Sequence, residues 1–284
     1  MSIERMAVIG AGTMGNGIAQ VCALAGLEVT LIDVAPAALD RGRSTIEKNL
    51  QRQMTKGVIS EVERATALSR ISTTTDSSTT SKSDLVIEAA TEDVNLKLRL
   101  LRQIGEQLKP GALMASNTSS ISITQLAAAT PCSDRFMGVH FFNPVPMMAL
   151  VELIRGVQTT DSTAAAMTDF VRRIGKTPIA VRNAPGFVVN RLLCPMINEA
   201  FCALGDGVAS AEEIDEGMKL GCGHPIGPLA LADLIGLDTL LAIMEVLYAD
   251  FGDSKYRPAW ALRELVAAGR LGRKTQRGVY EYQA

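Results

Sequence analysis

The stretch MAVIGAGTMG, residues 6–15, decides the fold, because an apolar run leads directly into a turn that carries three glycines. Residues 6–9 have the composition of a buried strand, and a helical pattern begins after Gly12. Gly10 permits a tight turn, Gly12 lets the backbone approach a phosphate, and Gly15 lets the helix pack closely on the strand. A Gly-x-Gly-x-x-Gly turn between a strand and a helix is typical of dinucleotide-binding proteins, in which the helix N-terminus attracts the pyrophosphate. The residues expected to contact the dinucleotide are Gly10, Gly12, Thr13, Met14 and Gly15.

An acidic residue at the end of the next predicted strand indicates which dinucleotide binds. Residues 28–33 have the pattern of a second strand, and Asp33 ends it eighteen positions after Gly15. A carboxylate at this place accepts hydrogen bonds from the ribose of the adenosine half and repels a 2′-phosphate. Positions 34 and 35 carry no arginine, so the sequence favours NAD over NADP. The glycine turn by itself is also compatible with FAD.

Strand-like and helical segments alternate along the first part of the chain. Nearly continuous apolar strands in such an alternation predict a mostly parallel, doubly wound sheet with helices on both faces. After Pro185 and Gly186 the periodicity is helical, with no convincing strand. We therefore expect an α/β Rossmann-type NAD-binding domain over residues 1–184 and an all-α C-terminal domain over residues 185–284. The predicted strands are 5–9, 28–33, 84–90, 112–116, 135–142 and 150–154, the predicted helices include 13–25, 36–56, 94–108 and 162–174, and residues 72–83, crowded with serine and threonine, are expected to be a loop.

Composition argues against several classes of function. The chain has 284 residues, a net charge of -2, 47% hydrophobic and 20% charged residues, so it offers no basic surplus for nucleic acid. No apolar run approaches the roughly 18 residues that span a bilayer, and the N-terminus lacks the features of a secretory signal. The five cysteines include no Cys-x-x-Cys pair, and Cys222 and His224 lack two further ligands, so neither disulfides nor a metal are expected. These features together predict a cytoplasmic protein.

Two polar clusters follow predicted strands, where open α/β sheets place their ligands. One is ASNTSS, residues 115–120, and the other is HFFNPVP, residues 140–146. Oxidation of an alcohol by NAD needs a base that titrates near neutrality, and the only histidines are His140 and His224. Glu152 is a lone acid in the apolar run LVELI and would need a partner if buried. We expect His140 to be the base and Glu152 to orient its ring, although the spacing also allows a purely structural histidine.

These motifs together resemble the short-chain L-3-hydroxyacyl-CoA dehydrogenases, most closely the bacterial 3-hydroxybutyryl-CoA dehydrogenases. The resemblance covers essentially the whole chain. It implies reversible, NAD-dependent oxidation of the 3-hydroxyl of an (S)-3-hydroxyacyl-CoA, with 3-hydroxybutyryl-CoA as the expected substrate. Besides the glycine turn with Asp33, the motifs that carry the resemblance are IEA (87–89), NTSS (117–120), HFFNP (140–144), PGFVVNR (185–191), GPL (227–229) and GRK (272–274).

The resemblance also implies roles for individual positions. His140 corresponds to the general base and Glu152 to the acid that orients it. Ser119 and Asn190 correspond to residues that hydrogen-bond the substrate oxygen, and Ser119 lies near the nicotinamide. Lys56, in a stretch with a basic surplus, falls where the family contacts CoA. The further NAD contacts that the resemblance implies are Glu92, Lys97, Ser119, Asn143 and Lys274.

Several alternatives remain open at this point. The same chemistry could act on a hydroxyacyl group borne by an acyl carrier protein, or on a sugar acid such as L-gulonate. A non-catalytic NAD-binding protein is a more remote alternative. Acyl chain length and physiological direction are not readable from the residues. Several segments after residue 230 are apolar on more than one face, so, with the family's habit of pairing, we expect a homodimer through the C-terminal domain, which also binds substrate.

Overall fold

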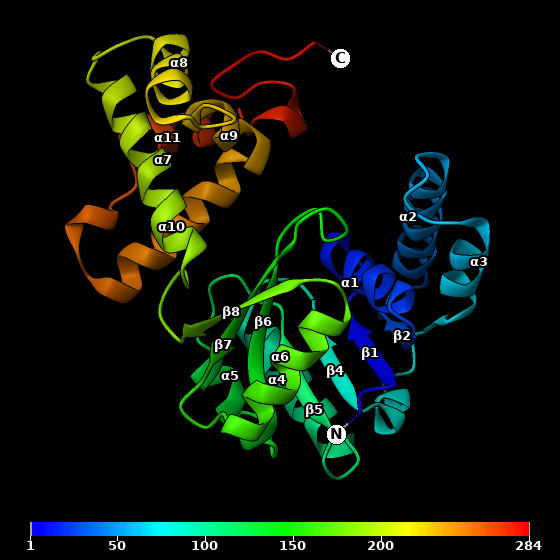
Figure 1. Ribbon diagram of the computed structural model, residues 1–284. Coiled ribbons are helices and arrows are strands. Elements are labelled where there is room, and N and C mark those ends of the chain that lie inside the picture. Colours follow the sequence, from blue (N-terminus) through cyan, green and yellow to red (C-terminus); the bar gives the residue numbers. More distant parts are fainter. Residues whose placement is uncertain (1, 284) are drawn as a thin grey trace. The chain divides into compact units, whose positions relative to one another are not determined.

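An eight-stranded sheet organises the first part of the chain in the computed structural model, which describes residues 2–283. The strands lie in the order β3-β2-β1-β4-β5-β6-β7-β8 (Figure 1). Neighbouring strands are parallel except β6 and β7, which are antiparallel. The mostly parallel sheet expected from the sequence is thus confirmed. The strands are β1 (Arg5–Ile9), β2 (Glu28–Ile32), β3 (Ile71–Thr74), β4 (Leu85–Glu88), β5 (Leu113–Ser116), β6 (Phe136–Phe141), β7 (Leu150–Arg155) and β8 (Thr177–Arg182).

Both faces of this sheet are covered by helices, which explains the continuous apolar strands. Successive side chains of a strand point to opposite faces. Met6 and Val8 of β1 belong to a core cluster that also contains Ile18 of α1 and Phe170 of α6. Ala7, on the other face of β1, is buried as well. The helices of this unit are α1 (Thr13–Leu24), α2 (Pro36–Thr55), α3 (Glu61–Ser69), α4 (Val94–Gln107), α5 (Ile123–Ala128) and α6 (Asp161–Arg173), with the short 3-10 helices η1 (Ser77–Lys82) and η2 (Ser133–Arg135).

The strands at the two edges of the sheet lie where no strand was predicted. β3 occupies the start of the segment that was expected to be a loop, and the rest of that segment forms η1. Ser72 and Thr73 of β3 are exposed, so the strand lacks the apolar pattern of its neighbours. β8 is likewise mostly half-buried or exposed. Edge strands bury less apolar surface than central ones, which explains why β3, with the sequence ISTT, was not predicted. β8 does carry an apolar run over residues 178–181, so its sequence held a signal that was missed.

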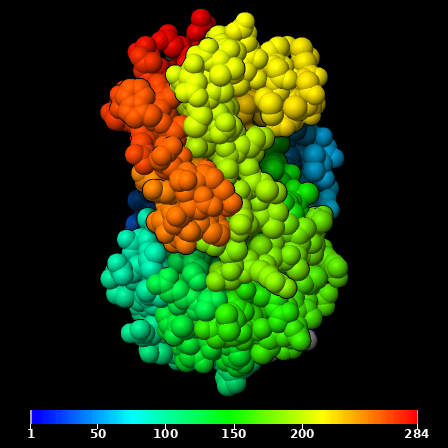
Figure 2. Space-filling model, turned by 90° about the vertical axis from the view of Figure 1, so that its left-hand side faces the viewer, coloured from blue at the N-terminus to red at the C-terminus, as the bar shows by residue number. Residues whose placement is uncertain are grey.

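The residues after Asn183 form a separate helical unit, Ala184–Ala284. Its core gathers buried side chains such as Phe201 of α7, Leu229 of α9 and Met244 of α10. Figure 2 shows α7 in yellow-green along one face of this unit, beside the orange residues that follow α10. None of the helices within residues 2–283 is long and apolar enough to cross a membrane. The helices of this unit are α7 (Val189–Gly205), α8 (Ala211–Cys222), α9 (Pro228–Ile235), α10 (Leu237–Phe251) and α11 (Trp260–Ala267), with η3 (Ser254–Tyr256) and η4 (Arg273–Thr275).

Two buried aspartates hold the C-terminal segment on this helical unit. Asp233 accepts hydrogen bonds from the backbone N–H of Val279 at 2.9 Å and of Tyr280 at 3.0 Å. The same carboxylate accepts the hydroxyl of Tyr282 at 2.9 Å. Asp215 accepts the hydroxyl of Tyr280 at 2.8 Å. Because both carboxylates are almost fully buried, these donors offset the cost of removing them from water.

Candidate active site

The glycine turn lies at the carboxyl end of β1, where a parallel sheet places its ligands. Gly10 has a φ of +99°, and a Cβ there would lie 2.6 Å from the carbonyl oxygen of Ala89. A Cβ on Gly15 would lie 1.7 Å from the carbonyl oxygen of Gly10. A Cβ on Gly12, in contrast, would meet no atom of the described residues within 4 Å. Gly10 and Gly15 therefore allow close packing, and Gly12 borders open space through which a phosphate can approach.

Asp33 follows the last residue of β2 and closes the same turn. Its Oδ2 accepts the N–H of Ala11 at 2.8 Å, and its Oδ1 accepts the N–H of Ala35 at 3.0 Å. A carboxylate has about four acceptor sites, so these two bonds leave capacity for ribose hydroxyls. The neighbouring Val34 is 92% exposed and uncharged, so this position offers no cation to a 2′-phosphate. The residues at this turn therefore fit NAD better than NADP.

His140 and Glu152 come together across the antiparallel pair of β6 and β7. They are direct partners in the register of the two strands. Nδ1 of His140 lies 2.7 Å from Oε2 of Glu152, and the side chains are 8% and 0% exposed. The ring of Phe142 lies 4.6 Å from the imidazole, centroid to centroid. An ionised carboxylate can only accept, so the hydrogen of a neutral His140 ring sits on Nδ1.

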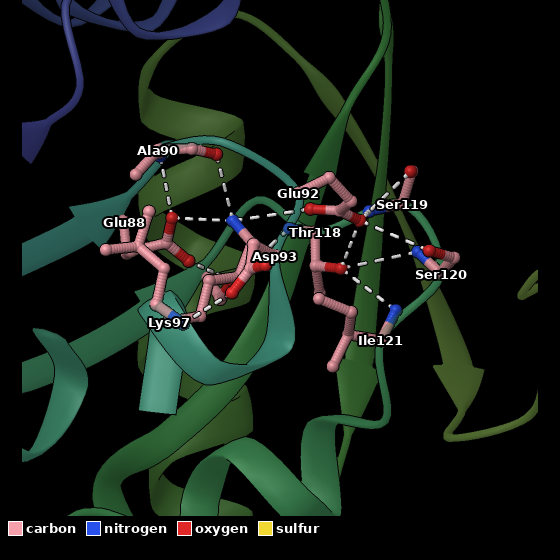
Figure 3. Close-up of polar contacts among 11 residues, drawn as sticks. Glu88, Ala90, Glu92, Asp93, Lys97, Thr118, Ser119, Ser120 and Ile121 are labelled. Carbon is pink, nitrogen blue, oxygen red and sulfur yellow. Dashed lines mark hydrogen bonds and ion pairs between the residues drawn. The ribbon is translucent and has the colours of Figure 1, made fainter. Parts of the chain in front are cut away.

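Ser119 lies in the turn after β5, and this turn is held by the carboxylate of Glu92 (Figure 3). Oε1 of Glu92 accepts the Thr118 hydroxyl at 2.6 Å and the backbone N–H and hydroxyl of Ser119 at 2.8 and 3.2 Å. Oδ1 of Asn117 accepts the N–H of Phe141 at 2.9 Å, which ties the turn to the strand of the candidate base. The two polar clusters of the sequence are therefore neighbours in space.

Glu92 and Lys97 form an ion pair together with a residue for which no role was predicted, Glu88. Nζ of Lys97 lies 2.6 Å from Oε1 of Glu88 and 3.3 Å from Oε2 of Glu92. Burial raises the pKa of Glu92, but the Lys97 charge and hydrogen bonds from Thr118 and Ser119 outweigh it and keep that pKa below its usual range. The sequence does contain a signal for Glu88, because it is the last residue and the only acid of the apolar strand β4. Glu152 is likewise the only acid within β7.

Two of the remaining candidate residues are exposed side chains of the first unit. Asn143 is exposed in the loop after β6, and Lys56 is exposed directly after α2. Two further candidates belong to the helical unit. Asn190 is half-buried in the first turn of α7, and Lys274 of η4 forms an ion pair with Asp238, with Nζ 2.6 Å from Oδ2.

Family models match two consecutive parts of the chain. The model of the 3-hydroxyacyl-CoA dehydrogenase NAD-binding domain matches residues 5–184. The model of the 3-hydroxyacyl-CoA dehydrogenase C-terminal domain matches residues 186–282. Nearly the whole chain is therefore covered by these two models.

Several named proteins are similar to this chain over its full length. The 3-hydroxybutyryl-CoA dehydrogenase of Bradyrhizobium diazoefficiens is 53% identical over 281 residues, which are 99% of this chain and 96% of that protein. The mitochondrial hydroxyacyl-coenzyme A dehydrogenase of Rattus norvegicus is 42% identical over 289 residues and covers 99% of this chain and 92% of its own. The crystal structure of (S)-3-hydroxybutyryl-CoA dehydrogenase PaaH1 from Ralstonia eutropha is 60% identical, with a TM-score of 0.97 and complete coverage of both chains. The resemblance read from the motifs is confirmed: the chain belongs to the 3-hydroxyacyl-CoA dehydrogenase family.

Proposed function

We propose that this protein oxidises the 3-hydroxyl of an (S)-3-hydroxyacyl-CoA to the 3-oxoacyl-CoA, reversibly and with NAD, and that its substrate is 3-hydroxybutyryl-CoA. The observation that carries the proposal is the 2.7 Å pairing of His140 with Glu152, beside a turn that presents Ser119. The similarity to proteins named 3-hydroxybutyryl-CoA dehydrogenase at 53% and 60% identity supports this choice of substrate.

His140 acts as the general base in the proposed reaction. Its Nε2 takes the proton of the 3-hydroxyl, and NAD held at the glycine turn would supply the acceptor for the hydride of C3. Glu152 keeps Nδ1 protonated and stabilises the imidazolium that forms. Ser119 and Asn190 donate hydrogen bonds to the substrate oxygen as it becomes a carbonyl. In the reverse direction the protonated His140 returns the proton to the same oxygen.

The proposed NAD contacts are those that the resemblance implies, and the geometry of the first unit supports several of them. Gly12 borders open space beside the N-terminus of α1, which favours a pyrophosphate, and Asp33 keeps acceptor capacity for the ribose. The other residues proposed to hold NAD are Gly10, Thr13, Met14, Gly15, Glu92, Lys97, Ser119, Asn143 and Lys274. A role for Lys274 would require its ion pair with Asp238 to open or to be shared.

Each part of the chain has its own role in the proposal. Residues 1–184 bind NAD, and residues 185–284 bind substrate and mediate pairing of two copies. Lys56 contacts the anionic CoA, which its exposure after α2 and the neighbouring Arg52 allow. In this proposal the substrate is an acyl-CoA and the assembly is a homodimer.

The test is the loss of the near-ultraviolet absorbance of NADH after addition of acetoacetyl-CoA, with NADPH in a parallel sample. Rapid loss with NADH and little change with NADPH is the expected result. Protein that binds NADH but shows no loss would contradict the proposed substrate. Acetoacetyl groups on an acyl carrier protein and L-gulonate would then be compared under the same conditions.

A further inference from the structure

The carboxylate of Glu88, at the carboxyl end of β4, is fully buried, and both of its oxygens accept hydrogen bonds (Figure 3). It accepts three hydrogen bonds, each 2.6 Å long: from Nζ of Lys97, from the hydroxyl of Ser116 and from the backbone N–H of Ala90. Lys97 and Ser116 are buried as well. Burying a carboxylate is costly unless its oxygens are satisfied in this way, so this site is built around the charge of Glu88.

The ammonium of Lys97 links Glu88 to Glu92, which belongs to the candidate active site. It donates to Oε1 of Glu88 at 2.6 Å and to the carbonyl oxygen of Ala90 at 3.1 Å, and it lies 3.3 Å from Oε2 of Glu92. These three partners match the three donors of a lysine. The Lys97 side chain is 1% exposed, so bulk water does not reach its ammonium. Its place is therefore set by the two carboxylates together.

The other oxygen of Glu92 holds the turn that carries Ser119. Oε1 accepts the hydroxyl of Thr118 at 2.6 Å, the N–H of Ser119 at 2.8 Å and the hydroxyls of Ser119 and Ser120 at 3.2 and 3.3 Å. Figure 3 shows Glu92 lying between Lys97 and this turn. An unbroken series of charge-assisted contacts thus leads from Glu88 through Lys97 and Glu92 to Ser119.

We propose that Glu88 is a positioning residue for the dehydrogenase reaction. Glu88 fixes the ammonium of Lys97, Lys97 balances Glu92, and Glu92 then holds Ser119 where its hydroxyl meets the substrate oxygen. This inference rests on the proposed function, from which Ser119 takes its role. Without the charge of Glu88, the ammonium has Glu92 as its remaining anionic partner and draws that carboxylate away from the turn. Small misplacements of a group that orients substrate lower turnover strongly.

Glu88→Gln tests this, because it keeps the shape of the side chain and removes its charge. We expect kcat with acetoacetyl-CoA, measured at saturating NADH, to fall by about tenfold or more. In a Ser119→Ala background the same substitution should lower kcat by less than about twofold, because its effect acts through Ser119. The proposal would be overturned if Glu88→Gln lowered kcat as strongly in the Ser119→Ala background as in the wild type. A Glu88→Gln single variant with the kcat of the wild type would overturn it as well.

Asp84→Asn is the matched control. Asp84 lies next to the opposite end of β4, and its carboxylate also pairs with a lysine, Lys109, and accepts the backbone N–H of Glu4 and Arg5. Its loss should lower the thermal stability and leave kcat unchanged. A fall in kcat equal to that of Glu88→Gln would mean that any lost ion pair of this strand slows the enzyme, and the inference would be wrong.

A measurement independent of turnover separates this inference from the proposed function. In a crystal structure of the Glu88→Gln variant, we expect the carboxylate of Glu92 to have left Thr118 and the turn of residues 118–120 to have moved. An unchanged turn would refute the role of Glu88 even if the wild type proved inactive with acetoacetyl-CoA. If the single variant does not fold, Glu88→Gln combined with Lys97→Met removes both charges, and normal kcat in that protein would equally refute it.

Discussion

His140 and Glu152 are held opposite each other by the pairing of β6 with β7, and their side chains meet at 2.7 Å. Because the carboxylate stabilises the imidazolium that forms when the base takes a proton, its charge matters for the rate. We expect Glu152→Gln to lower kcat by about 10²- to 10⁴-fold, the range typical of general base catalysis. Absorbance assays measure kcat, and a fluorescence titration should show NADH binding unchanged.

A second carboxylate paired with a residue of β7 provides the control for this prediction. Asp161 is exposed, and its Oδ1 lies 2.7 Å from the guanidinium of Arg155, the last residue of β7. Asp161→Asn should turn over at the wild-type rate, since exposed pairs contribute little. A Glu152→Gln or His140→Gln enzyme that also kept wild-type turnover would exclude the proposed base.

The residues of the site differ in how far the sequence could predict them. Glu152 stands out in an apolar run, and the paired strands bring it to His140 as expected. Glu88 carries the same signal, but its partners Lys97 and Ser116 come from α4 and β5. Only the fold shows which donors surround a buried acid, so no role for Glu88 followed from the sequence.

The same limit applies to the elements. The central strands were predicted within one or two residues, because they are buried on both faces and therefore continuously apolar. β3 and β8 lie at the edges of the sheet, and most of their residues are half-buried or exposed, so neither strand is buried on both faces as the central ones are. Helix α3 begins with a capping box formed by Ser60 and Glu63. This local motif indicates the start of a helix independently of hydrophobic periodicity.

Helix α2 packs against the glycine turn at Gly42. A Cβ on this buried glycine would lie 2.9 Å from the carbonyl oxygen of Ala11, which is backbone and cannot swing aside. Gly42→Ala should therefore push the turn and α2 apart and weaken NADH binding by about tenfold, although alanine favours the helix by up to about 1 kcal/mol. A fluorescence titration with NADH measures the change.

Gly217 in α8 is the matched glycine for this comparison. A Cβ there would meet no atom of the described residues within 4 Å. Gly217→Ala should raise the free energy of unfolding by about 0.5–1 kcal/mol and leave NADH binding unchanged. Wild-type NADH affinity in Gly42→Ala would show that the turn tolerates the shift, contrary to the role proposed for its geometry.

The C-terminal segment gives the helical unit a dependence on alkaline pH. Burial, the hydrogen bond to Asp233 and the charge of that carboxylate raise the pKa of Tyr282 to about 12. The unfolded phenol ionises first, near pH 10, so the stabilisation is complete below that pH and is lost as the pH rises towards 12. We expect the free energy of unfolding to fall over this range, and to fall less steeply in Tyr282→Phe. Denaturant titrations at a series of pH values measure the slopes.

Tyr248 of α10 serves as the control tyrosine, because it is 40% exposed. Tyr248→Phe should keep the wild-type slope of stability against pH. If the free energy of unfolding fell equally steeply with pH in Tyr282→Phe and in the wild type, Tyr282 would not be the cause of the loss of stability at alkaline pH. Below pH 10, Tyr282→Phe should lower the free energy of unfolding by about 1 kcal/mol at every pH, because the hydrogen bond to Asp233 is lost.

At the scale of the whole molecule, the helical unit leaves large apolar side chains in contact with solvent. Leu220 of α8 is 79% exposed, Leu234 of α9 is 54% exposed and Trp260 of α11 is 74% exposed. Single exposed apolar residues are common, but in the proposed homodimer these three side chains would be buried against the second copy. The chain has a mass of 30.2 kDa, so we expect light scattering at micromolar concentration to give about twice that mass.

Charged substitutions locate the contact between the two copies. Glutamate at the centre of an apolar interface leaves an unpaired buried charge, so at least one of Leu220→Glu, Leu234→Glu and Trp260→Glu should reduce the measured mass to that of a single chain. Val62→Glu, at a 75% exposed position of α3 in the other unit, should leave the dimer intact. A monomeric wild type would contradict the dimer itself. Dissociation by Val62→Glu, with all three helical-unit variants still dimeric, would instead move the contact to the NAD-binding unit, and α7 to α11 would then need another explanation for their exposed apolar residues.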